Sequence, residues 1–133
     1  MERTFMQALE SRRTFYAIGS KSPVSDDQIE EVIKFAVKHV PSAFNSQSTR
    51  VVLLLGESHK RVWNIAKDIL RKIVPAEAFK GTEEKINNCF LAGYGTVLYF
   101  EDQDVVKGLQ DQYPSYADNF PVWSQQTSAM HQL

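Results

Sequence analysis

Apolar residues recur at helical spacing in several parts of the chain, and the clearest example follows Ser25. One stripe there is formed by Ile29, Val32, Ile33, Ala36 and Val40. Ser25 and Gln28 match a capping box at its start, and Pro41 predicts its end because the residue before a proline disfavours helical conformation. A second stripe runs from Ser58 to near Pro75, and shorter helices are predicted at residues 5–9 and 104–110.

Two short runs, the aliphatic residues 51–55 and the mostly apolar residues 96–100, predict β-strands. The first is continuously apolar, so we expect it to be buried on both faces. Helices and strands together predict an α+β fold. A sheet of only two strands is not stable by itself, and a further helical stripe (Trp123, Thr127, Met130) begins close to the end of the sequence. We therefore expect one domain, residues 1–133, that is the N-terminal part of a larger fold.

Composition and charge exclude several classes of function. With 43% hydrophobic and 23% charged residues, the chain has the composition of a globular protein. Its net charge of −1 gives no field for nucleic acid or anionic lipid. Cys89 is the only cysteine, the N-terminus carries no apolar leader, and no aliphatic run could span a bilayer. We expect a cytoplasmic protein that binds neither nucleic acid nor a membrane.

Arg12, Arg13 and Thr14 follow the first predicted helix. Two adjacent guanidinium groups and a hydroxyl are suitable donors for a phosphate. Such a pair is more commonly a solvated complement to the helix C-terminus, so this segment alone does not predict a site.

The loop at residues 41–49 is the second candidate. Ser42, Asn45 and Gln47 place short donors and acceptors between a helix and a buried strand. These groups need partners, supplied either by local turns or by a polar ligand such as the carbonyls and ring nitrogens of a flavin.

Other chemically interesting residues favour structural roles. His39, His59 and His131 are scattered without metal-ligand spacing, so no metal site is predicted, and His39 fits the C-terminal dipole of its helix. Residues 83–85 are interpreted as the solvated start of a helix. Three aromatic residues could face a substrate, although core packing or an interface is favoured for them: Tyr116, Phe120 and Trp123.

The order of these features resembles the FMN-dependent nitroreductase family, with arginines after the first helix and Pro-Ser-x-x-Asn-x-Gln before the first strand. Residues 94–102 and 116–124 resemble a subgroup related to the fungal fatty-acid-repression proteins and their bacterial counterparts. The resemblance implies a nitroreductase-like α+β fold with a central mixed or antiparallel sheet flanked by helices. A family domain has about 200 residues, so this chain would be the N-terminal two-thirds, roughly, of that fold.

The resemblance also implies a function. Family members are homodimers with FMN at the interface, and they use NADH or NADPH to reduce nitroaromatics, quinones or similar small acceptors by ping-pong hydride transfer. Arg12, Arg13 and Thr14 would then meet the FMN phosphate and ribityl chain. Ser42 and Asn45 would approach the flavin from the partner subunit, and Gln47 would lie near the ring. No side chain is expected to be catalytic, because the flavin carries the chemistry.

Two positions depart from the family pattern, which commonly reads Pro-Ser-Ser-x-Asn-x-Gln-Pro. Ala43 removes one hydroxyl, and Ser48 in place of proline is expected to loosen the start of the first strand. Two alternatives stay open: a non-catalytic regulatory or fatty-acid-response relative that keeps the fold, and an inactive dimerising fragment. The sequence selects neither the physiological acceptor nor NADH over NADPH.

Overall fold

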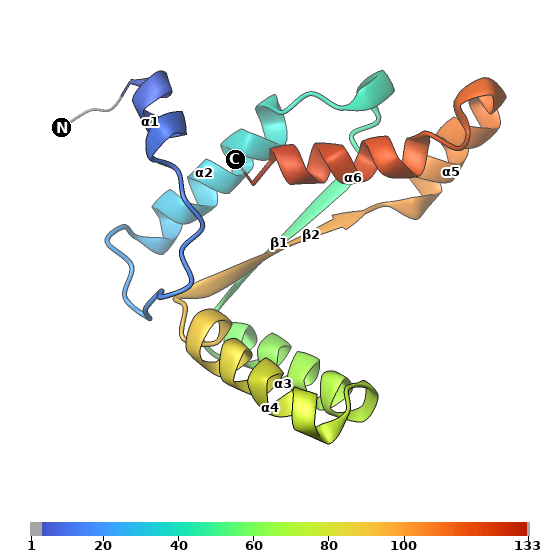
Figure 1. Cartoon of the computed structure of the whole chain (residues 1–133). Coiled ribbons are helices and arrows are strands. Elements are labelled where there is room, and N and C mark those ends of the chain that lie inside the picture. Colours follow the sequence, from blue (N-terminus) through green and yellow to red (C-terminus); the bar gives the residue numbers. More distant parts are fainter. Residues whose placement is uncertain (1–3, 133) are drawn as a thin grey trace. The chain divides into compact units, whose positions relative to one another are not determined.

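The computed structural model describes residues 4–132, which form six α-helices and one two-stranded antiparallel sheet (Figure 1). The strands are β1 (Thr49–Leu55) and β2 (Gly95–Glu101), and the helices are α1 (Phe5–Ser11), α2 (Asp26–His39), α3 (Gly56–Ile73), α4 (Ala76–Lys85), α5 (Gln103–Gln112) and α6 (Phe120–Met130). This content confirms the α+β class. Residues 1–3 and 133, on which the expectations about the two chain ends partly rest, lie outside the described residues.

The chain divides into two compact units, each built from two stretches of sequence. We call Met1–Lys21 with Gly56–Tyr94 the helical unit, and Ser22–Leu55 with Gly95–Leu133 the sheet unit. The expectation of a single domain over residues 1–133 stays a prediction.

The sheet unit is organised by the pairing of β1 with β2. Their register runs from Thr49 opposite Glu101 to Leu55 opposite Gly95. A Cβ atom at position 95 would meet the Leu54 carbonyl oxygen at 2.9 Å, so glycine suits the close approach of the strands here. Helix α2 contacts β1, and α6 contacts both strands.

The apolar strand β1 is less buried than its sequence predicts. Leu53, Leu54 and Leu55 are half-buried and Val52 is 42% exposed, so the expected burial on both faces is wrong for this chain. Within residues 4–132 the sheet has only two strands, and the sheet unit does not supply a full apolar cover for both of their faces.

Helix α2 begins and ends where the sequence predicts. The Gln28 backbone N–H donates to Ser25 Oγ at 3.3 Å, and the Ser25 N–H donates to Gln28 Oε1 at 3.1 Å, which completes the capping box. Lys38 and His39 lie in the last turn, where positive charge suits the helix dipole. The defined start and end of α2 therefore fix where the following loop begins, at Pro41.

An aromatic cluster forms the centre of the sheet unit. Phe120 of α6 is 1% exposed, and its ring lies 5.2 Å from Phe44 and 5.5 Å from Trp123, measured between centroids. Tyr113, just after α5, lies 4.8 Å from Phe44. Core packing, the interpretation favoured from the sequence, is confirmed for Phe120, whereas Tyr116 is 48% exposed.

The helical unit packs α3 against α4. The rings of Trp63 and Phe90 stack at 4.8 Å, and Arg71 of α3 donates to Glu83 of α4 at 2.9 Å. Residues 83–85 therefore end a helix instead of starting one, and a π-helical turn (Ile86–Phe90) follows directly. The helix start predicted at these residues is wrong, because a Glu-Glu-Lys run suits either end of an exposed helix. Along residues 4–132, no helix combines the length and apolarity needed to cross a bilayer.

The buried position of Phe120 predicts a large stability effect. Phe120→Ala should lower the free energy of unfolding by about 3–5 kcal/mol, because it removes apolar contacts and leaves a cavity. Val122→Ala on the same helix, where Val122 is 53% exposed, should change it by less than about 0.5 kcal/mol. Urea unfolding followed by circular dichroism measures both, and equal midpoints for the two variants would contradict the assignment of Phe120 to the core.

Candidate functional site

The loop between α2 and β1, residues 41–48, has an unusual backbone, and we call it the site loop. Phe44, Asn45 and Gln47 have φ angles of 55°, 53° and 49°. This left-handed conformation is common for asparagine but costs about 1–2 kcal/mol for other residues with a side chain. Strained residues cluster at functional sites when their surroundings hold them in place. The backbone thus marks the loop independently of its side chains.

Hydrogen bonds bring together the three loop residues that the sequence singles out. The Gln47 N–H donates to Ser42 Oγ at 3.1 Å, and Gln47 Nε2 donates to Asn45 Oδ1, also at 3.1 Å. The Asn45 N–H donates to the Ser42 carbonyl at 3.0 Å. Ser42, Asn45 and Gln47 therefore form one small polar group at the surface of the sheet unit.

These residues line a cavity of about 500 Å³, which we call the polar cavity. Its other walls come from the end of α2, the start of β1 and the end of α6. A second cavity of about 470 Å³, the aromatic cavity, is lined by Phe44, Trp123 and Met130 among others. Pro41, Ser42 and Thr127 contribute to both, so the site loop and α6 form a wall shared by the two cavities.

The polar cavity has a basic lining. Lys38, His39, Arg50 and His131 contribute to its walls, and no aspartate or glutamate of the described residues does so. Arg50 is held in place, because its Nη2 lies 2.9 Å from Asp102 Oδ2 and its Nη1 donates to the Gln47 carbonyl at 2.9 Å. Sequence reasoning missed Arg50, whose only signal was a basic residue at the start of an apolar strand.

A second missed residue is Glu101, at the end of β2. Its carboxylate accepts hydrogen bonds from Ser48 Oγ at 2.5 Å, from Thr49 Oγ1 at 3.2 Å and from Ser128 Oγ. Ser48 is 1% exposed. The Ser48 hydroxyl thus has a half-buried charged partner that holds the start of the strand. The expectation that serine is looser than proline at this position stays a prediction.

Tyr99 of β2 connects the same strand to the end of α6. Its hydroxyl donates to the His131 carbonyl at 3.3 Å, and burial raises the pKa of this phenol above its ordinary value of 10.0. The phenol therefore stays protonated, and remains a donor, throughout the physiological pH range.

Arg12, Arg13 and Thr14 are exposed in the helical unit, directly after α1. Arg13 Nη1 donates to the carbonyls of Glu10 at 2.9 Å and Arg12 at 2.8 Å, so this arginine caps the helix as the simpler interpretation anticipated. The site loop belongs to the other unit. That both segments hold one ligand stays a prediction.

Two of the three histidines, His59 and His131, have structural hydrogen bonds. His59 Nε2 lies 3.2 Å from the Leu91 carbonyl, and His131 Nδ1 lies 2.8 Å from the Thr127 carbonyl. Between residues 4 and 132, no group of three or more His, Cys, Asp or Glu side chains is arranged to hold a metal ion.

Comparison with known proteins places this geometry in context. The Saccharomyces cerevisiae proteins HBN1 and FRM2, the latter described as a nitroreductase, are each 33% identical to the chain over 132 residues. These matches cover 98% and 97% of the chain but 65% and 64% of the two relatives. The chain thus spans slightly less than two-thirds of the length of these curated relatives.

Solved structures similar to this chain are also nitroreductases. Nitroreductase CinD from Lactococcus lactis in complex with chloramphenicol is 40% identical with a TM-score of 0.80, over 97% of this chain and 64% of that one. A Saccharomyces cerevisiae nitroreductase is 30% identical with a TM-score of 0.80, over 96% of this chain and 69% of that one. The nitroreductase family model matches residues 9–132. The chain therefore belongs to the nitroreductase family and has the α+β fold of that family over the part it spans.

Proposed function

We propose that this chain is the FMN-binding part of an oxidoreductase that acts as a homodimer. NADH or NADPH supplies hydride, and nitroaromatics, quinones or similar small molecules accept it in a ping-pong cycle. The observation that carries the proposal is the convergence of Ser42, Asn45 and Gln47 on one polar cavity. Family membership supports the reaction class. The cytoplasmic location that we expect rests on the sequence alone.

The site loop fits the edge of a flavin ring. The bond from Gln47 Nε2 to Asn45 Oδ1 uses neither the Asn45 amide hydrogens nor the Gln47 Oε1 atom. Ser42 Oγ accepts from the Gln47 N–H, which does not use the hydroxyl hydrogen. The loop thus pairs donors with an acceptor, as the carbonyls and the ring N–H of a flavin require. The cavity volume also lies within the range of about 300–1,000 Å³ that is usual for small-molecule sites.

In this proposal the side chains of the protein bind FMN and orient its ring. Ser42 and Asn45 would approach the flavin from the partner subunit, as the family resemblance implies, and Gln47 would lie near the ring. The basic lining would stabilise negative charge. Arg12, Arg13 and Thr14 would hold the phosphate and ribityl chain, for which forked guanidinium donors are well suited. Bound FMN would supply the hydride-transfer chemistry, so no side chain needs to act as a nucleophile.

The aromatic cavity is our candidate site for the acceptor. Phe44 and Trp123 offer ring faces there, with centroids 6.0 Å apart and planes inclined by 15°, and Met130 adds an adaptable apolar contact. CinD has been solved with chloramphenicol and with 4-nitrophenol, which supports a small organic acceptor for the family member described here.

Loss of one arginine should weaken FMN binding. We expect Arg13→Ala to lower FMN affinity about tenfold to a hundredfold, since a hydrogen bond to a charged group contributes about 1.5–3 kcal/mol. Arg61→Ala removes an exposed arginine of α3 in the same unit and should leave the affinity unchanged. Fluorescence titration of the chain with FMN measures both, and equal dissociation constants would remove Arg13 from the site.

Turnover separates an enzyme from a non-catalytic relative. The FMN-loaded chain should oxidise one equivalent of NADH or NADPH as its flavin is bleached. Continued oxidation should need a quinone or nitroaromatic acceptor, because the reduced flavin has to be reoxidised in each cycle. Absorbance of the nicotinamide and of the flavin, followed together, measures this cycle. Retained FMN that NADH and NADPH fail to bleach would contradict the enzyme and favour the regulatory alternative. A chain that never retains FMN through gel filtration would contradict binding by these residues.

A further inference from the structure

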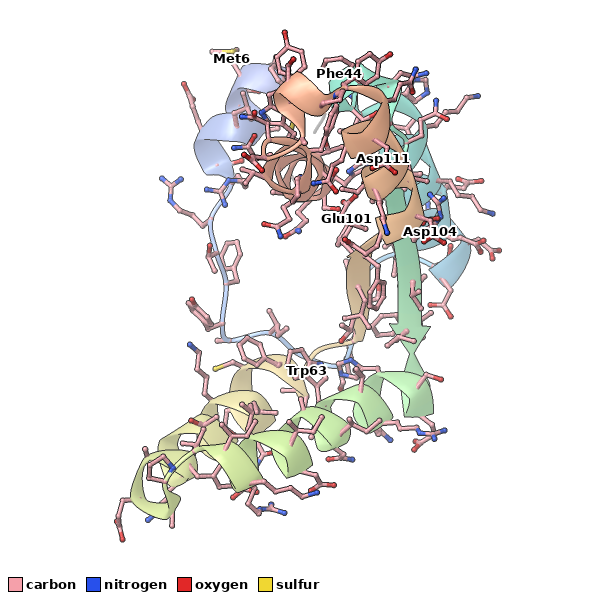
Figure 2. The ribbon with its side chains drawn as sticks, turned by 90° about the vertical axis from the view of Figure 1, so that its right-hand side faces the viewer. Met6, Phe44, Trp63, Glu101, Asp104 and Asp111 are labelled. Carbon is pink, nitrogen blue, oxygen red and sulfur yellow. The ribbon has the colours of Figure 1, made fainter. Side chains whose placement is uncertain are left out.

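The Glu101 carboxylate lies where three hydroxyl groups converge. Ser48 Oγ donates to Oε2 at 2.5 Å, while Thr49 Oγ1 and Ser128 Oγ both donate to Oε1. The three donor residues are 1%, 9% and 8% exposed, respectively. Figure 2 labels Glu101 at the end of β2 nearest α6, and Ser128 lies on that helix. A half-buried acid therefore joins the end of the site loop, the first residue of β1 and α6.

This arrangement requires a carboxylate. Hydrogen bonds to an ionised acceptor are roughly twice as strong as neutral ones, and a carboxylate accepts at both oxygens. A glutamine at position 101 would present one oxygen and one NH₂ group. Its NH₂ would face hydroxyls that donate in the native cluster, so at least one buried bond would be lost or reversed.

The cluster acts on the site loop through Ser48. This residue directly follows Gln47, whose φ of 49° has to be maintained by its surroundings. The Ser48 carbonyl also accepts the Asp102 N–H at 2.9 Å, and Asp102 holds Arg50 by an ion pair. Neighbouring side chains of an extended chain point to opposite sides. Glu101 therefore binds the Ser48 hydroxyl on one side of the strand, while the Asp102 side chain binds Arg50 on the other.

The same carboxylate also controls the opposite wall of the cavities. Ser128 is adjacent to Thr127, which lines both the polar and the aromatic cavity. One side chain therefore links the loop wall to the α6 wall, beside the ring contacts of Phe44 with Phe120 and Trp123. Glu101 itself lines neither cavity, although Thr49, one of its three donors, lines the polar cavity.

We propose that Glu101 is the positioning residue of the site: through Ser48 it holds the left-handed site loop, and through Ser128 it holds α6 against that loop. The consequence for flavin binding rests on the proposed function, whereas the effect on the loop does not. Glu101 would thus act through Ser48 and the loop amides without touching cofactor or acceptor.

The first test follows the loop without any ligand. Hydrogen–deuterium exchange of residues 41–48 should become about tenfold faster in Glu101→Gln and in Ser48→Ala, the loss expected for one bond to a charged group. The double variant should exchange little faster than either single variant, because both break the same link. Asp111→Asn, which neutralises an exposed acid of α5, is the matched control and should exchange as the wild type does.

The second test measures the FMN affinity of the wild type, of the same four variants and of Ser128→Ala. Glu101→Gln and Ser48→Ala should weaken binding by similar factors, about tenfold, whereas Ser128→Ala should mainly lower the unfolding temperature. If Glu101→Gln does not fold, Ser48→Ala carries both tests. Ser48→Thr, which keeps a hydroxyl at this position, should bind FMN more tightly than Ser48→Ala does.

Two outcomes would overturn the proposal. One is unchanged exchange of residues 41–48 in both Glu101→Gln and Ser48→Ala; the other is an equal rise in exchange throughout the sheet unit, which would show a general loss of stability. Failure of the proposed function is recognised separately. A wild-type chain that binds no FMN would contradict flavin binding while the exchange experiment still decides whether Glu101 positions the loop.

Discussion

The register of β1 on β2 is the constraint on which the sheet unit depends. Thr49 pairs with Glu101, and this pairing brings the hydroxyls at the end of the site loop to a single carboxylate. A slip of one residue would pair Thr49 with Phe100 or Asp102 instead of Glu101. These neighbouring side chains point to the opposite face of the strand in the native register. Phe100 is 51% exposed, so the slip would also turn an exposed ring toward the polar cluster. Apolar packing alone does not fix this register as firmly, because β1 is aliphatic at every position from 51 to 55.

Much of the local structure could be predicted from the sequence, because its causes are local. The capping box of Ser25 and Gln28, the stop at Pro41 and the two aliphatic strands each depend on residues a few positions apart. Ser42, Asn45 and Gln47 could be singled out as one polar loop by the same kind of reasoning, whereas their contact with a flavin stays a prediction. The place of Arg12 and Arg13 in that site stays a prediction.

Other features could not be found this way, because they depend on contacts between distant residues. Glu101 and Ser48 are 53 positions apart, and nothing in either neighbourhood indicates the other. The left-handed conformation of Phe44 has no sequence signal either, since the ring cluster that holds it comes from α6 and the segment before it. The π-helical turn after α4 was missed because its residues would also suit a regular helix.

The course of the chain between the two strands has a consequence for how the fold tolerates change. Residues 56–94 leave the sheet after Leu55 and return at Gly95, and these two residues are paired with each other. The helical excursion is therefore, in topological terms, an insertion between neighbouring points of a hairpin. Doubling its length would add only about 0.6 kcal/mol of closure entropy. Evolution could thus lengthen, shorten or replace this segment while the strand register stays intact.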